Sequence, residues 1–165
     1  MRIEEIFHSI QGEGTRRGRP CTFVRLTGCP LRCVWCDTAY AFGGGTDMTL
    51  DEIVEVVASH PARLVCVTGG EPLAQDAVHD LMRRLADDGY EIVLETSGAL
   101  DATTVDERVV RILDLKAPGS GEAHRVHAPT FDALRPRDEI KVVLADRADY
   151  GWARGQIEER ALEGG

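Results

Sequence analysis

The chain of 165 residues contains no apolar run that approaches the roughly 18–20 residues of a membrane span. Its first residues, 1–5 (MRIEE), contain no apolar stretch typical of a signal peptide. Basic residues are also scarce: 19 Lys and Arg stand against 28 Asp and Glu, which gives a net charge of −9. Because binding to nucleic-acid phosphates requires clustered Lys and Arg, we expect no nucleic-acid partner. We expect a cytoplasmic protein without a membrane segment, and we interpret the excess acid as a solvated surface.

A secreted disulfide framework is also not indicated. The five cysteines are an odd number, and three of them lie in one short loop. This favours a reducing compartment, in which thiolates stay available for metal. The composition, 43% hydrophobic and 28% charged, is that of an ordinary globular protein. The length suits a single domain over residues 1–165, and there are no internal repeats or low-complexity tracts.

Strand and helix patterns alternate along most of the chain, which predicts an α/β fold with parallel strands and covering helices. A Thr-x-x-Glu capping box at Thr49 and Glu52 predicts the start of the first helix. The expected strands are 3–10, 21–26, 64–68, 91–95, 109–115 and 139–144, and the expected helices are 50–59, 75–88 and 146–162, with only a weak helix signal over 101–108.

About six strands are too few for a closed eight-stranded barrel, so we expect an open, partial (β/α)6-type barrel. Polar residues follow several of the strands, at 68–71, 95–97, 114–116 and 141. In parallel α/β architectures the carboxyl ends of the strands form the working face of the sheet. The sequence therefore predicts that these polar residues surround one site.

The most specific motif is the loop 28–38, where Cys29, Cys33 and Cys36 have the spacing Cys-x3-Cys-x2-Cys. A closed iron–sulfur cubane normally takes four thiolates, and no fourth cysteine lies nearby in the sequence. The loop therefore predicts a four-iron cluster with one open iron, which the amino and carboxylate groups of S-adenosylmethionine can chelate. One electron from such a cluster breaks a carbon–sulfur bond and releases a 5′-deoxyadenosyl radical.

Other interpretations of the cysteines fit less well. A structural zinc site needs a fourth Cys or His, and the spacing to His8, the nearest upstream candidate, matches no zinc pattern. Cys21 and Cys66 lie in predicted strands, where a free cysteine is usually a small buried hydrophobe. The run 69–72 (GGEP) is explained equally well as a plain tight turn, but beside the cysteine loop we interpret it as the seat of the methionine amino group.

These residues resemble the 7-carboxy-7-deazaguanine synthase family of the radical S-adenosylmethionine superfamily over nearly the whole chain. The resemblance rests on 6–14 (IFHSIQGEG), 23–26 (FVRL), 36–38 (CDT), 68–73 (TGGEPL) and 95–98 (ETSG). It implies a lyase that contracts the ring of 6-carboxy-5,6,7,8-tetrahydropterin to 7-carboxy-7-deazaguanine with loss of ammonia, in queuosine or 7-deazapurine biosynthesis. It also implies Mg²⁺, S-adenosylmethionine used catalytically, a flavodoxin or ferredoxin as electron donor, and a homodimer.

The resemblance also implies roles for individual residues. The cluster ligands would be Cys29, Cys33 and Cys36, and Thr38 would offer its hydroxyl to Mg²⁺. The cofactor would be bound by Trp35, Cys36, Asp37, Gly70, Asp114, Leu115 and Lys116, and the pterin by Ile10, Gln11, Gly12, Arg25 and Thr68. Taken singly, several have plain structural alternatives, such as a surface position for Arg25 or a helix cap for Thr38. Glu71 and Glu95 are expected to brace the site.

The chain departs from the family in one respect, because members usually continue with a further strand, helix and tail. We therefore expect a barrel that lacks its last strand and C-terminal tail, which would either impair pterin binding or leave a gap that a partner subunit fills. Two other functions stay open. A small activating enzyme that installs a glycyl radical on a partner shares the cysteine spacing, and a non-enzymatic iron–sulfur or zinc protein would have a fully ligated metal.

Overall fold

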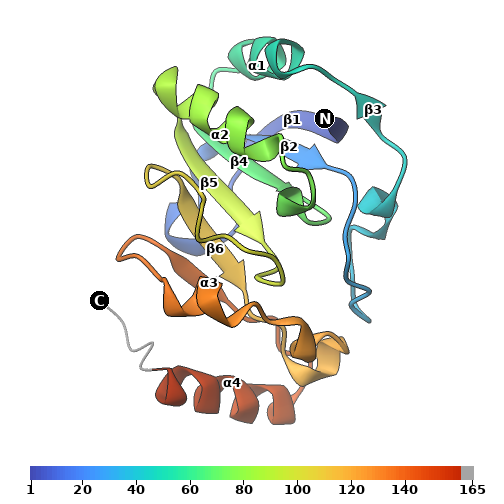
Figure 1. Cartoon of the computed structure of the whole chain (residues 1–165), viewed down its shortest axis with the longest axis vertical. Helices are drawn as coiled ribbons and strands as arrows, with labels where there is room; N and C mark the ends of the chain where they lie inside the picture. The colour runs from blue at the N-terminus through green and yellow to red at the C-terminus, as the bar shows by residue number, and fades with distance from the viewer. Residues whose placement is uncertain (161–165) are drawn as a thin grey trace.

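The computed structural model describes residues 1–160 as a seven-stranded sheet with helices packed against it (Figure 1). The order of the strands in the sheet is β3-β1-β2-β4-β5-β6-β7. The strands are β1 (Arg2–Ile10), β2 (Pro20–Leu26), β3 (Thr46–Asp47), β4 (Leu64–Gly69), β5 (Glu91–Thr96), β6 (Val110–Asp114) and β7 (Glu139–Lys141). The α-helices are α1 (Leu50–Ala58), α2 (Val78–Asp87), α3 (Ala128–Asp132) and α4 (Arg147–Glu159). Five 3₁₀-helices lie at Gly14–Arg16, Ala39–Phe42, Pro72–Ala74, Pro118–Ser120 and Ala123–Arg125.

The five strands β2, β4, β5, β6 and β7 run parallel, as the alternation predicted, but β1 does not. It pairs antiparallel with β2, and the short β3 pairs antiparallel with β1. The expectation of parallel strands was wrong here because the connection from β1 to β2 is the loop 11–19, and a parallel pair needs a crossover of a dozen or more residues. Within residues 1–160 the sheet is not closed, which confirms the open, partial barrel.

One face of the sheet is covered by α1 and α2, which lie together above β4 and β5 in Figure 1. The capping box predicted for α1 is present, since the Glu52 amide donates to Thr49 Oγ1 (3.3 Å) and the Thr49 amide donates to Glu52 Oε2 (2.7 Å). The apolar side chains of this layer form one continuous core: Val24, Leu26, Ile53, Val57, Val65, Val67, Val78, Leu81, Met82, Leu85, Ile92 and Leu94.

Several predicted boundaries were wrong. Helix α2 begins at Val78 rather than Gln75, because Gln75 has an extended backbone and its side-chain Nε2 donates to the carbonyls of Arg2 and Thr27 (both 3.0 Å). Strand β7 ends at Lys141, not residue 144, because its neighbour β6 ends at Asp114, which is the residue paired with Lys141. The last two residues of the helix predicted over 146–162 lie outside the described residues.

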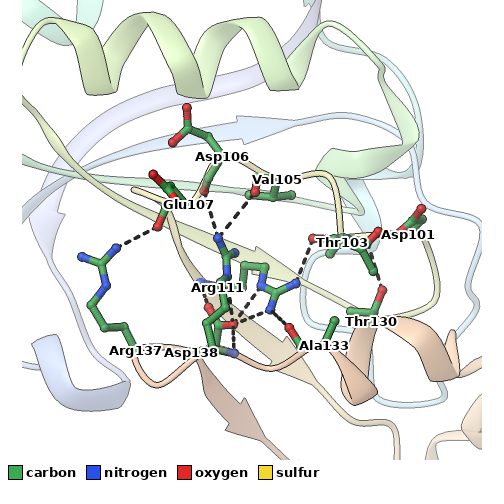
Figure 2. A network of polar contacts seen from close by, with 12 residues as sticks. Asp101, Thr103, Val105, Asp106, Glu107, Arg111, Thr130, Ala133, Arg137 and Asp138 are labelled. Atoms are coloured by element: carbon green, nitrogen blue, oxygen red, sulfur yellow. Dashed lines mark hydrogen bonds and ion pairs between the residues drawn. The ribbon is translucent and has the colours of Figure 1, made fainter.

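The weakly signalled helix over 101–108 is absent, and a buried ionic network occupies this side of the sheet instead (Figure 2). Arg111 on β6 is 1% exposed and alternates with Val110 and Ile112, so it points to the helix-bearing face. Its guanidinium binds the Asp138 carboxylate (Nε to Oδ2, 3.0 Å) and donates to the carbonyls of Ala102 (2.9 Å) and Ala133 (2.6 Å). This Arg111–Asp138 network joins the connection before β6, which contains no α-helix, to the loop between α3 and β7.

The opposite face of the sheet carries a second apolar cluster: Cys21, Leu64, Cys66, Val93, Val110 and Ile112, with Phe23 packed against it. Cys21 and Cys66 are fully buried, so their interpretation as core residues is confirmed. Burial raises the pKa of Cys21 to about 12 and that of Cys66 well above its ordinary value, which keeps both thiols protonated. Among residues 1–160, no helix has both the length and the apolar character needed to cross a membrane.

Candidate functional site

A cavity of about 440 Å³ lies at the carboxyl ends of the parallel strands, on the side of the sheet where the predicted polar residues gather. Segments that follow β2, β4, β5 and β6 line it, together with the end of β7 and the loop 11–19. Such a volume lies within the range of small-molecule and cofactor sites. The prediction that one site forms at these strand ends agrees with this position.

The cysteine loop forms one wall of the cavity, and Cys29, Cys33 and Cys36 are all half-buried, free thiols that line it. The Gly28 amide donates to the Ala41 carbonyl (2.8 Å) and the Val34 amide donates to the Ser120 carbonyl (3.0 Å), so the start and the middle of the loop are fixed. Burial raises the pKa of Cys29 and of Cys33, so a metal must displace the thiol protons when it binds.

Three thiols are a set of ligands suited to a cluster of several metal atoms. They are soft sulfur ligands in one loop, facing one cavity, and a cluster with one open iron needs three. Among residues 1–160, no three His, Cys, Asp or Glu side chains come close enough together to hold a single metal ion. A cubane cluster takes its thiolates at separate corners, so its ligands do not have to meet at one point.

The turn after β4 packs directly against the cysteine loop. The Gly70 amide donates to the Leu26 carbonyl (3.1 Å) and the Glu71 amide to the Gly28 carbonyl (2.7 Å). A Cβ atom on Gly70 would collide with the Gly28 carbonyl and with the Cys29 side chain, so this close approach requires glycine. The backbone of the turn is thereby brought next to Cys29.

Glu71 is fully buried and braces the site from behind. Its carboxylate accepts hydrogen bonds from the Leu73 amide (3.0 Å), the Thr96 hydroxyl (2.9 Å) and the Ser97 amide (2.8 Å). These bonds join the turn after β4 to the turn after β5. Thr96 and Ser97 line the cavity, so Glu71 fixes two of its walls at once.

A second part of the cavity wall is a polar group built on Glu95, near the end of β5. Its carboxylate accepts from the Gln11 side-chain amide (3.3 Å) and from the Thr68 hydroxyl (3.0 Å). Gln11 is 2% exposed, so this polar group is largely removed from solvent. Gln11, Gly12 and Thr68, all predicted pterin contacts, line the cavity together with Glu95.

Arg25 on β2 also lines the cavity, and its neighbours hold it in place. Its Nε donates to Glu5 Oε1 (2.8 Å), and the Tyr40 hydroxyl donates to the same oxygen (3.1 Å). The guanidinium carbon lies 5.9 Å from the ring centroids of both Phe7 and Tyr40. A guanidinium fixed in this way is suited to bind a carboxylate.

The predicted cofactor residues lie mainly on the cysteine side of the cavity. Trp35, Asp37, Gly70, Asp114 and Lys116 line it, and Lys116 forms an ion pair with Asp114 (2.9 Å). The other oxygen of Asp114, Oδ1, is buried and has no hydrogen-bond partner among the described residues. An acceptor of this kind is available to a hydroxyl group of a bound ligand.

The structure does not bring two of the predicted site residues to the cavity through their side chains. Ile10 is 63% exposed at the end of β1, and Leu115 is buried in the core on the helix-bearing face. Any contact that they make with a ligand would come from their main chain. The sequence pattern could not reveal this, because main-chain contacts leave no requirement on residue type.

Other residues of the cavity were not predicted. The apolar ones, Phe23, Leu31, Phe42, Ile112 and Val143, gave no signal because they look like ordinary core residues. Glu13, which was also not predicted, forms an ion pair (2.6 Å) on the cavity wall with Lys141, one of the polar residues predicted at the strand ends. Burial alone would lower the pKa of Lys141, but the neighbouring carboxylate of Glu13, with those of Asp114 and Glu95, outweighs it and raises the pKa.

An open parallel sheet with a three-cysteine loop after its first parallel strand is the arrangement of a radical S-adenosylmethionine protein, and the family model described as "Radical SAM superfamily" matches residues 23–148. The 7-carboxy-7-deazaguanine synthase of Koribacter versatilis is 48% identical over 165 residues, which cover 99% of this chain and 73% of that protein. The enzyme of that name from Chlorobaculum tepidum is 46% identical, covering 99% of this chain and 76% of its own. The chain belongs to the 7-carboxy-7-deazaguanine synthase family of the radical SAM superfamily.

A solved structure supports the same assignment. The crystal structure of QueE from Escherichia coli matches with a TM-score of 0.80 at 25% identity, over 95% of this chain and 77% of that one. The family resemblance and the expected radical SAM fold are therefore both confirmed.

Proposed function

We propose that the chain is a radical SAM lyase that converts 6-carboxy-5,6,7,8-tetrahydropterin to 7-carboxy-7-deazaguanine with loss of ammonia. The observation that carries this is that one cavity is lined both by the thiols at 29, 33 and 36 and by the polar group built on Glu95. Relatives of that name at 48% and 46% identity support the substrate and the reaction. The product belongs to queuosine or 7-deazapurine biosynthesis.

Proteins of the radical SAM superfamily hold a four-iron cluster and S-adenosylmethionine, which together supply a 5′-deoxyadenosyl radical. Here Cys29, Cys33 and Cys36 would hold three irons. The cofactor would be bound by the side chains of Trp35, Asp37, Asp114 and Lys116 and by the main chain of Gly70 and Leu115. The unpartnered Oδ1 of Asp114 supports a contact with a hydroxyl group of the cofactor.

On the substrate side, the chain's own residues bind and orient the pterin. Arg25 would bind its carboxylate, while Gln11 and Thr68 present polar groups that Glu95 already orients. Gly12 and Ile10 would contribute their main chain. Apolar residues of the lining, among them Phe23, Leu31 and Ile112, would exclude water from the reacting atoms.

A finer part of the proposal concerns Mg²⁺ and the partners. Thr38 lines the cavity with its hydroxyl 3.7 Å from Cys36 Sγ, and it would offer that oxygen to Mg²⁺ beside the substrate carboxylate. The protein would act as a single domain over residues 1–165, in the cytoplasm, as a homodimer that receives electrons from a flavodoxin or ferredoxin.

Replacing Thr38 with Val should raise the Mg²⁺ concentration needed for half-maximal turnover by about tenfold, because one hard oxygen ligand is lost at nearly constant volume. Thr38→Ser keeps the hydroxyl and should retain the wild-type Mg²⁺ dependence. Turnover measured over a Mg²⁺ titration decides the matter. An unchanged midpoint for Thr38→Val would rule out a ligand role.

Arg25→Lys keeps the charge but removes the planar fork, so the KM for the pterin should rise by about tenfold to a hundredfold. Steady-state kinetics at saturating S-adenosylmethionine measure this value. The same change at Arg84, an exposed residue of α2 that pairs with Asp88 (3.2 Å), is the matched control and should leave the KM unchanged. A KM for Arg25→Lys equal to that of the control would contradict the carboxylate contact.

The function itself is tested by anaerobic reconstitution with iron and sulfide, followed by S-adenosylmethionine, Mg²⁺, reductant and the pterin, with mass spectrometry of the products. Formation of 7-carboxy-7-deazaguanine is expected. Release of 5′-deoxyadenosine without that product would keep the radical chemistry and overturn the substrate. Absence of both from cluster-loaded protein would overturn the proposed enzyme.

A further inference from the structure

The loop 11–19 reaches across the sheet from β1 and β2 to the far strand β7. In Figure 1 it is the blue segment behind β5 and β6. Strands β1 and β7 are separated in the sheet by four other strands, β2, β4, β5 and β6, so neither strand positions the other directly. The loop therefore connects two distant parts of the sheet.

Glu139 on β7 makes several contacts with the loop 11–19. Its carboxylate accepts from the Thr15 amide (3.0 Å), from the Thr15 hydroxyl (2.7 Å) and from Arg16 (2.9 Å). The side chains of Arg16 and Glu139 are 16% and 17% exposed, so this ion pair is partly desolvated. Arg16 also pairs with Glu91 at the start of β5 (2.7 Å).

The backbone of the loop is shaped for this contact. Gly14 has a φ of +66°, which favours glycine, and a Cβ atom there would collide with the Glu139 carboxylate. The loop backbone at Gly14 thus lies directly against the Glu139 carboxylate. A second pair, Glu13 with Lys141 (2.6 Å), fastens the same loop two residues further along β7.

The loop 11–19 also contributes polar residues to the wall of the cavity. Gln11 accepts a hydrogen bond from the Glu13 amide through Oε1 (3.2 Å) while its Nε2 donates to Glu95 (3.3 Å). Glu139 itself does not line the cavity, whereas Gln11, Gly12 and Glu13 do. Any displacement of the loop at Thr15 and Arg16 is therefore passed along a few residues of chain to the Gln11 side chain.

We propose that Glu139 is a positioning residue for the pterin: it fastens the loop 11–19 to β7 and so holds Gln11, Gly12 and Glu13 in place. This inference rests on the proposed function in that it assigns the pterin to this end of the cavity. It predicts that loss of Glu139 weakens pterin binding while cofactor binding on the cysteine side is unaffected.

The test uses Glu139→Ala and, in case that variant folds poorly, Glu139→Gln, which keeps an acceptor for Thr15 but loses the charge. Arg19→Gln is the control, because it removes an exposed ion pair of the same loop, with Glu91 (2.7 Å), without touching β7. Two quantities are measured on each: amide hydrogen exchange of residues 11–19, and the Kd of the pterin for cluster-loaded protein with S-adenosylmethionine but no reductant.

For Glu139→Ala we expect faster exchange at the Thr15 amide and a pterin Kd raised about tenfold or more, with Glu139→Gln in between. The Kd of S-adenosylmethionine should stay within about twofold of wild type, whereas a general loss of structure would move both. Unchanged exchange in Glu139→Ala, or faster exchange with an unchanged pterin Kd, overturns the inference. The binding measurement involves no turnover, so it tests the inference separately from the proposed function. Protein that binds the pterin but forms no product when reductant is added would contradict the proposed function and leave the inference standing.

Discussion

Cys33→Ala is expected to lose the iron–sulfur cluster and, with it, product formation by at least about a thousandfold, because the cofactor supplies the chemistry that the protein only orients. Cys33 is half-buried on the cavity wall and its loop supplies all three of the proposed thiolates. Iron content, visible absorption and 5′-deoxyadenosine release after anaerobic reconstitution measure the loss at three successive steps.

Cys21→Ala is the matched control, because it removes the same group from a fully buried site in the second apolar cluster. It should keep the iron content and turnover of the wild type, with a free energy of unfolding lowered by about 1 kcal/mol. Loss of iron in Cys21→Ala, or full iron content in Cys33→Ala, would contradict the division of the five cysteines into three ligands and two core residues.

Asp138→Ala is expected to lower the free energy of unfolding by about 3–5 kcal/mol, because it leaves the Arg111 guanidinium buried without its counter-charge. Both side chains of this pair are 1% exposed, and Asp138 also accepts from the Arg135 amide (2.8 Å). Urea denaturation monitored by circular dichroism measures the change. The whole free energy of unfolding of a domain of this size is about 5–15 kcal/mol, so the variant should retain only a small part of it.

The control is Asp80→Ala, which breaks an exposed ion pair with Arg83 on α2. Exposed pairs contribute about 0–1 kcal/mol, so this variant should unfold at nearly the wild-type urea concentration. If the two variants were equally stable, the Arg111–Asp138 network would have no special role in fixing the loops before β6 and β7.

The Asp138 carboxylate also makes the stability of the protein depend on pH in the acid range. Burial alone would raise the pKa of Asp138, but hydrogen bonds from Arg111 and from the Arg135 amide outweigh it and hold the pKa below its ordinary value. A group with a lowered folded pKa stabilises the protein above its unfolded pKa of about 3.9, and that stability is lost as the pH falls towards the folded pKa. Asp138→Asn should therefore lose less stability than the wild type below about pH 4, and equal losses would contradict this assignment.

Motifs that act within a few residues of sequence were the most predictable part of this protein. The cysteine loop and the turn 69–72 could be recognised because their ligands are neighbours in the chain, and the structure packs Gly70 against Cys29 as close backbone approach requires. The capping box of α1 was predictable for the same reason. Cys21 and Cys66 were assigned to the core correctly because a free cysteine in a strand is usually a small buried hydrophobe.

Features that depend on distant residues could not be predicted. Nothing in the run 109–115 indicates that Arg111 is buried, because its partner Asp138 lies in another loop. The ion pair between Glu13 and Lys141 could not be predicted for the same reason. The direction of β1 was missed because an apolar strand pattern is the same in parallel and antiparallel pairs, and only the length of the following loop distinguishes them.

The thiols and the rest of the cavity lining come from stretches of sequence of very different length. The three thiols lie within residues 29–36, whereas the rest of the lining extends from Gln11 to Val143. During synthesis on the ribosome, all three thiols therefore emerge before β4 to β7 have been made, whereas the part of the cavity wall at Lys141 must wait for β7. The three thiols are thus complete as a set before the cavity around them exists.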